Sequence, residues 1–168
     1  KSRVPVLIVK APGRGPYGRV LVPVDFSPAG ELAIRMAREV APDAFVVLLN
    51  VFDVPFESML QYAGVSQDDI HRYRIEARQR SVQQLHALAA RAGLDHGQYT
   101  MLVEHGDATR VIVDQAERSD CELIVMGKHG THVSEELLLG SVTKRVLDES
   151  DVDLLVVVDK RRPDSTVP

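Results

Sequence analysis

The sequence from Cys121 to Leu147, CELIVMGKHGTHVSEELLLGSVTKRVL, decides the fold of this chain. It starts with the apolar run from Leu123 to Met126, which predicts a short strand buried on both faces. Two glycines then open a loop, and a Gly-Ser step leads into a segment that predicts a helix. A strand that delivers a glycine-rich loop to a helix N-terminus is a common way for α/β proteins to hold phosphate groups.

The glycines of this stretch each have a physical use. Gly127 and Gly130 lack side chains and permit positive φ, so backbone N–H groups there can approach an anion. Gly140 and Ser141 stand where the helix begins, and the free amides and the positive end of the helix dipole face the same anion. The Ser141 hydroxyl either caps its own helix or donates to a phosphate oxygen. Spacing alone leaves a phosphate-binding loop and a purely structural loop equally open.

The rest of the chain alternates apolar runs with amphipathic segments. The predicted strands are 20–24, 44–52, 99–104, 123–126 and 154–158, and the predicted helices are 29–41, 68–92, 108–118 and 141–149. The long helix places Tyr73 and Leu85 on one apolar face. This alternation predicts an α/β fold, a doubly wound three-layer sandwich around a parallel sheet. Ligands of such sheets bind beyond the carboxyl ends of the strands, where Asp25, Val51 and Gly127 fall.

An extra N-terminal strand is predicted for residues 4–9 (VPVLIV), followed by a linker rich in glycine and proline. The segment from Ser2 to Val9 aligns with that from Ser150 to Val157, because both have a serine, a valine two places on and then four aliphatic residues. Either two buried strands resemble each other by chance, or residues 1–10 are the end of a preceding, similar domain. We therefore divide the chain into a strand and linker (1–18), one domain (19–159) and a flexible tail (160–168).

Composition argues against several classes of partner. The net charge is −4 and the 20 basic residues are spread along the chain, which disfavours nucleic acid because that binding depends on phosphate neutralisation. No apolar run approaches the roughly 18 residues of a membrane span, and no secretory signal is visible. Cys121 is the only cysteine, which precludes an internal disulfide and favours a reducing compartment. We expect a cytoplasmic protein.

Motifs of common nucleotide enzymes are missing from the sequence. It has neither the G-x-x-x-x-G-K-[ST] loop of P-loop NTPases nor a G-x-G-x-x-G after the first strand of the domain, as dehydrogenases have. Glu135 and Glu136 are candidates for a general base only by proximity. His129 and His132 are too few for a structural zinc site. We assign no catalytic residue and no metal ligand.

Three segments carry a resemblance to a known family. IVMGKHG (124–130), ELLLGSV (136–142) and VLVPVDFSP (20–28) closely resemble the universal stress protein family, and the spaced glycines resemble its ATP-binding branch. The resemblance covers residues 19–159 and implies a five-stranded parallel sheet of order 3-2-1-4-5. The residues that it implies for ATP binding are Pro23, Val24, Asp25, Val51, Met126, Gly127, Gly130, Gly140, Ser141, Val142 and Thr143.

The resemblance also implies a function. We expect an ATP-binding stress-response protein, with magnesium accompanying the nucleotide, that acts as a nucleotide-dependent regulatory or protective module and hydrolyses ATP slowly at most. The alternative is a dimerisation or protein-interaction module with a vestigial site. The experiment that separates the two is a test for bound adenine nucleotide.

Assembly is the last expectation drawn from the resemblance. Some family members carry two such domains in tandem, and family dimers commonly pair their last strands antiparallel. We therefore predict a homodimer or a tandem-domain arrangement, in which residues 4–9 pair antiparallel with residues 154–158 of the same or a neighbouring chain. Asp153 stands where the family often has proline, which affects the start of that last strand.

Overall fold

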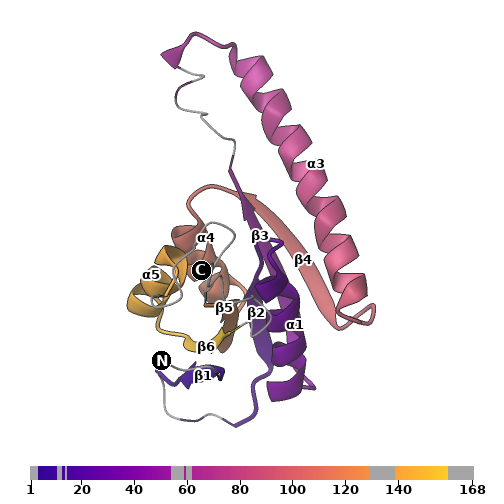
Figure 1. The fold of residues 1–168 in the computed structure, drawn as a ribbon, viewed down its shortest axis with the longest axis vertical. Helices are drawn as coiled ribbons and strands as arrows, with labels where there is room; N and C mark the ends of the chain where they lie inside the picture. The colour runs from indigo at the N-terminus through magenta and orange to yellow at the C-terminus, as the bar shows by residue number, and fades with distance from the viewer. Residues whose placement is uncertain are drawn as a thin grey trace, which may run out of the picture.

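The computed structural model describes residues 4–10, 13, 15–53, 59, 62–128 and 139–158. These residues form an α/β fold in which helices cover both faces of a central sheet (Figure 1). Its strands are β1 (Val6–Ile8), β2 (Arg19–Pro23), β3 (Phe45–Phe52), β4 (Tyr99–His105), β5 (Leu123–Gly127) and β6 (Asp153–Val157). Its helices are α1 (Pro28–Val40), α3 (Gln67–Arg91), α4 (Ala108–Arg118) and α5 (Ser141–Glu149).

The sheet confirms the predicted topology. Its strand order is β1-β6-β5-β2-β3-β4, and every neighbouring pair except β1 with β6 is parallel. Without β1, the five parallel strands have the order 3-2-1-4-5 that the sequence led us to expect. The order in which strands are added to the sheet reverses between β2 and β5. Ligands of such sheets bind at this point, beyond the carboxyl ends of β2, β3 and β5.

Two apolar cores lie on the two faces of the sheet. Alternate residues of β2 face opposite sides, so that Val22 packs with Ile34 of α1 and Leu88 of α3, whereas Leu21 packs with Ile112 of α4. All of these side chains are buried. Burial on both faces explains why a central strand such as β5 is a continuous apolar run in the sequence.

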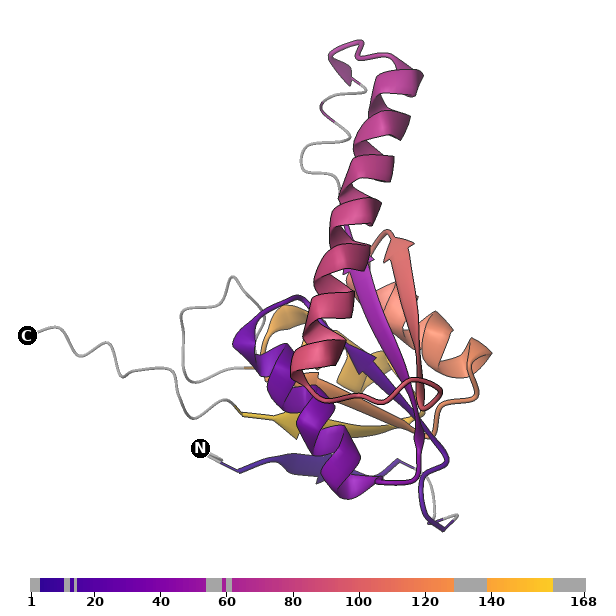
Figure 2. The same ribbon diagram turned by 90° about the vertical axis from the view of Figure 1, so that its right-hand side faces the viewer.

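The long helix α3 extends well beyond the sheet, as Figure 2 shows. Most of its buried residues lie in its C-terminal part, where Leu85 and Leu88 join the core. Tyr73 and Ile75, nearer its start, are 41% and 44% exposed. The prediction that Tyr73 belongs to the buried face of this helix is therefore wrong: this part of α3 extends beyond the sheet, and of the residues near its start Ile70 is buried at 1% exposure whereas Tyr73 is not.

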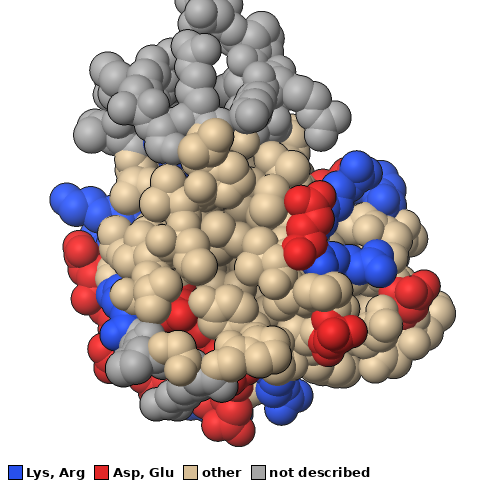
Figure 3. Space-filling view, turned by 90° about the horizontal axis from the view of Figure 1, so that it is seen from below, with Lys and Arg blue, Asp and Glu red and all other residues tan. Residues whose placement is uncertain are grey.

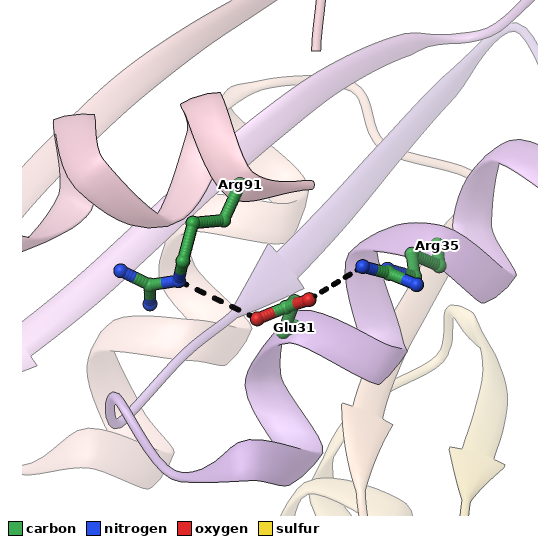
Figure 4. A network of polar contacts seen from close by, with 3 residues as sticks. All are labelled: Glu31, Arg35 and Arg91. Atoms are coloured by element: carbon green, nitrogen blue, oxygen red, sulfur yellow. Dashed lines mark hydrogen bonds and ion pairs between the residues drawn. The ribbon is translucent and has the colours of Figure 1, made fainter. Parts of the chain in front are cut away.

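Charged side chains are distributed unevenly over the surface. Seen from the side on which β1 lies in Figure 1, the middle of the surface that the described residues form is mostly uncharged, with acidic and basic side chains around it (Figure 3). On the face that α1 and α3 cover, Glu31 joins the two helices, because its carboxylate contacts Arg35 at 2.7 Å and Arg91 at 3.5 Å (Figure 4). The ion pair with Arg91 adds a weak, partly exposed contact between the C-terminal end of α3 and α1.

The N-terminal strand pairs within its own chain. Val6, Leu7 and Ile8 lie antiparallel to Val156, Leu155 and Leu154. The predicted pairing is thus present, over three described residues rather than six. β6 begins at Asp153, one residue earlier than predicted.

Within the described parts of the chain, no helix combines the length and the apolar character that crossing a bilayer requires.

Candidate functional site

A cleft of about 280 Å³ opens at the carboxyl ends of β2, β3 and β5. Ten of the eleven residues predicted for the site line it: Pro23, Val24, Asp25, Val51, Met126, Gly127, Gly140, Ser141, Val142 and Thr143. The eleventh, Gly130, lies outside the described residues. The structure therefore brings together side chains that are more than a hundred residues apart in the sequence.

The N-terminus of α5 presents unpaired donors to this cleft. Gly140 precedes the helix in an extended conformation (φ −56°, ψ 150°), and its own N–H donates to the carbonyl of Lys128 at 2.8 Å. The first helical hydrogen bond is that from Lys144 N–H to the Gly140 carbonyl, at 2.9 Å. Among the described residues, none accepts a hydrogen bond from the amides of residues 141–143. Three N–H groups and the positive end of the dipole are thus available to an anion.

Thr143 fixes this helix end to the sheet. Its hydroxyl donates to the carbonyl of Gly127 at 2.9 Å, and the residue is 3% exposed. The next backbone amide, that of Lys128, donates to the Val157 carbonyl of β6 at 2.8 Å. The end of β5 is therefore held both by the helix that follows it and by the neighbouring strand. This arrangement preorganises the donors, which lowers the cost of ordering them around a ligand.

The opposite wall is the turn from β2 into α1. Phe26 has a φ of 62°, a left-handed conformation that is unusual for a large side chain. The turn brings the carboxylate of Asp25 to the main-chain N–H of Ser27, at 3.1 Å. Buried Asn50 supports the turn from β3, because its amide donates to the Val24 carbonyl at 2.8 Å. A strained residue held by such supports is typical of functional sites.

Ser27 stands at the N-cap position of α1 without capping the helix. Helix α1 begins directly after it, as an N-cap serine would predict, but its hydroxyl makes no capping hydrogen bond. That hydroxyl oxygen is buried in the wall of the cleft, and no described group pairs with it. Pro28 occupies the first helical position and has no N–H to be capped, which removes part of the need for a side-chain cap. Ser27 therefore offers the cleft a polar group that the sequence alone did not reveal.

The middle of the cleft is apolar. Leu49, Val51, Ile112 and Met126 line it, and Asp25 is the only carboxylate in the described lining. Acid–base catalysis requires titratable groups within hydrogen-bond reach of the reacting atoms, usually an acid and a base. The described lining offers one such group, Asp25. The amides at the start of α5 and the apolar middle of the cleft together suit the binding of a molecule with an anionic end and an apolar part.

Sequence reasoning missed six lining residues: Ser27, Ala29, Gly30, Leu49, Ala108 and Ile112. Ala108 could have been found, since it follows the carboxyl end of β4 at the start of a helix. Ile112 lies one helical turn further on, on the same side of α4. Gly30 has a packing role, because an added Cβ would come within 3.4 Å of the Val24 side chain. The pattern of residues gave no signal for Leu49, which reads as one of several core residues of its strand.

The sequence of this chain is similar to those of universal stress proteins. The model of the universal stress protein family matches residues 16–158. The chain is similar to the universal stress protein MJ0531 of Methanocaldococcus jannaschii, with 33% identity over 150 residues, covering 86% of this chain and 84% of the relative. It is also similar to MJ0577 of the same organism, with 26% identity over 159 residues, covering 86% and 96%.

Solved structures share the fold. The structure of MJ0577 superposes with a TM-score of 0.74 at 24% identity and covers 87% of this chain and 99% of that one. A universal stress protein in complex with cAMP gives a TM-score of 0.55 at 24% identity, covering 85% and 98%. A universal stress protein of Archaeoglobus fulgidus gives 0.64 at 22% identity, covering 94% of this chain and 50% of that one.

Proposed function

The chain belongs to the universal stress protein family, and we propose that it binds ATP in the cleft at the carboxyl ends of β2, β3 and β5. The bound nucleotide would make the protein a regulatory or protective module of the stress response. The observation that carries this proposal is the start of α5, where the amides of residues 141–143 have no acceptor among the described residues and adjoin an apolar slot.

The two ends of the cleft suit the two ends of a nucleotide. Amides at a helix N-terminus are the usual partners of phosphate oxygens. The apolar slot between Val51 and Met126 suits a flat base, and the carboxylate of Asp25 can accept hydrogen bonds from ribose hydroxyls. A protein of the same fold binds cAMP, which is also an adenine nucleotide. Magnesium would enter with the ATP phosphates, because Mg²⁺ is commonly held by them with only one or two carboxylates.

We propose that the protein hydrolyses ATP slowly at most. Fast phosphoryl transfer needs a residue that positions the attacking nucleophile and metal ions that neutralise the phosphates. In the described lining, Asp25 is the only residue that could act as a base. The nucleotide therefore serves as a bound ligand whose presence changes the stability of the protein.

Thermal unfolding with and without Mg-ATP tests the proposal. A ligand at about a hundred times its Kd adds ~2.7 kcal/mol to stability. For a domain of this size that is a rise in Tm of roughly 5–11 °C. An unchanged Tm, together with the absence of adenine nucleotide in mass spectra of freshly denatured protein, would instead favour an interaction module with a vestigial site.

The variant Ser141→Pro tests whether the amide of residue 141 binds ATP. Proline is tolerated at the first position of a helix, and the extended conformation of Gly140 is the one that a following proline requires. The variant removes one amide donor and the hydroxyl, and Ser141→Ala removes only the hydroxyl. One charge-assisted hydrogen bond is worth about 1.5–3 kcal/mol. We expect Ser141→Pro to keep its Tm without ATP and to bind ATP at least ~10-fold more weakly, with a smaller loss for Ser141→Ala.

A further inference from the structure

The hydroxyl oxygen of Ser27 is a buried polar atom in the wall of the candidate binding cleft, and no described group pairs with it. The amide oxygen of Asn50 is also buried without a described partner, but Asn50 is not among the described residues that line the cleft. Burying a hydroxyl without a hydrogen bond destabilises a folded protein, and such groups are rare in native structures. The cleft is the place where a partner from outside the chain can reach Ser27.

The local backbone accounts for the absence of a cap. A capping serine accepts the amide of the second or third residue of its helix. In α1 the first residue is Pro28, which has no N–H, and the amide of the third, Gly30, donates to the Ser27 carbonyl at 3.0 Å. Ser66 shows the ordinary arrangement at the start of α3, since its hydroxyl accepts the Asp69 N–H at 3.1 Å. The Ser27 hydroxyl therefore has no part in capping α1.

The turn that holds Ser27 also places it beside a carboxylate. The Ser27 N–H donates to Asp25 at 3.1 Å, so the hydroxyl and the carboxylate belong to one turn of the same cleft wall. Phe26 between them, with a φ of 62°, and the fixed φ of Pro28 restrict this turn. Ser27 as a residue is only partly buried, so rotation about its Cα–Cβ bond, which has three staggered positions, can turn the hydroxyl from the wall into the cleft.

A carboxylate and a hydroxyl in one turn suit two neighbouring hydroxyls of a sugar. An ionised carboxylate only accepts hydrogen bonds, whereas a serine hydroxyl both donates and accepts. One sugar hydroxyl can therefore donate to Asp25, and the other can pair with Ser27 in either direction. The apolar slot between Val51 and Met126 suits the base, so the sugar is the part of the nucleotide that needs polar side chains of this kind.

We propose that Ser27 is a specificity-determining residue: together with Asp25 it binds the vicinal diol of the nucleotide sugar, and its hydroxyl makes the cleft prefer a ribonucleotide to an analogue that lacks one of the two sugar hydroxyls. The ligand thereby supplies the partner that the Ser27 hydroxyl lacks among the described residues. This inference rests on the proposed binding of ATP and deepens it, because it names the residue that distinguishes between sugars.

Calorimetric titration with ATP, 2′-deoxy-ATP and 3′-deoxy-ATP, each with magnesium, is the test. The parent chain is compared with Ser27→Ala and with the control Ser66→Ala, which removes a hydroxyl that does cap its helix and that is not in the described lining of the cleft. Thermal unfolding without nucleotide measures the stability of the same three proteins.

We expect Ser27→Ala to bind ATP roughly 3–10-fold more weakly, which is the contribution of one neutral hydrogen bond. The preference of the parent for ATP over one deoxy analogue should disappear, and its preference over the other, whose missing hydroxyl pairs with Asp25, should remain. Without nucleotide, Ser27→Ala should keep or raise its Tm, because no hydrogen bond is lost. Ser66→Ala should lose about 2–4 °C, as expected for a lost cap, and bind all three nucleotides like the parent.

Three results would overturn the proposed role of Ser27. The first is a Ser27→Ala variant that binds ATP like the parent. The second is a variant that binds all three nucleotides more weakly by the same factor, which would mark a structural effect. The third is a fall in its Tm without nucleotide as large as that of Ser66→Ala, which would show that the hydroxyl is paired within the chain. A parent that binds none of the three nucleotides would instead refute the proposed function, and this inference with it.

Discussion

Replacing Thr143 by valine tests how the sheet positions the candidate binding site. The Thr143 hydroxyl donates to the Gly127 carbonyl at 2.9 Å from a residue that is 3% exposed. Valine has nearly the same shape but leaves this partly buried carbonyl without its partner, which costs about 1–3 kcal/mol. The added methyl group returns up to ~0.8 kcal/mol. The net loss is roughly 0.2–2 kcal/mol, a fall in Tm of up to about 8 °C for a chain of this length.

The same change should weaken ligand binding. The hydroxyl fixes the first turn of α5 to the end of β5, so its loss frees the amides of residues 141–143 to move. We expect ATP to bind more weakly by up to about tenfold, which corresponds to 1.4 kcal/mol. Calorimetric titration measures the affinity, and urea unfolding measures the stability.

Thr143→Ser is the control for this experiment. It keeps the hydroxyl and removes only the methyl group, so it should cost roughly 0.8 kcal/mol of stability and leave ATP binding unchanged. Equal effects of the valine and serine variants on binding would refute the role of the hydrogen bond. So would a valine variant as stable as the parent.

Three other predictions follow from the described contacts. Burial, followed by the hydrogen bond to Asp153, raises the pKa of Tyr17 to about 12. The stabilisation that the protonated Tyr17 side chain contributes should therefore be complete below pH 10 and lost as the pH rises through 12. In urea unfolding, the stabilities of the parent and of Tyr17→Phe should converge near pH 12. Burial raises the pKa of Cys121 to about 11, so at pH 8 its thiolate should be roughly 100-fold scarcer than usual and iodoacetamide should label it only after denaturation. In urea unfolding, Leu88→Ala should cost about 2–5 kcal/mol, whereas Ile75→Ala on the exposed part of α3 should stay within about 0.5 kcal/mol.

Much of the fold could be predicted from the sequence because burial on both faces leaves a clear pattern. Strand β5 is an uninterrupted apolar run, and β3 is apolar except for Asn50. Helix starts are marked by residues such as Asp107, whose carboxylate accepts the Arg110 N–H. Gly93, with a φ of 69°, directly follows the C-cap of α3, where glycine is a common helix-ending signal. These signals are local, so a single sequence contains them.

Other features could not be predicted because they depend on distances between elements. The periodicity of α3 continues through Tyr73, and nothing in the helix itself indicates where the sheet beneath it ends. The Ser27 hydroxyl has the sequence signature of an N-cap, yet the turn at Phe26 places it in the cleft wall. For the cleft, glycine spacing located the α5 side, whereas the contribution of Ile112 required knowledge of how α4 crosses the sheet.

The pairing of β1 with β6 has a consequence for biosynthesis. Leu7 and Leu155, which lie opposite each other, are 148 residues apart in the chain. At a translation rate of about 5–20 residues per second, roughly 7–30 s pass between the synthesis of these two residues. β1 therefore leaves the ribosome about that long before the strand with which it pairs. β1 is thus among the first segments of this sequence to leave the ribosome and among the last to reach its final place, so the final closure of the sheet joins the two ends of the fold.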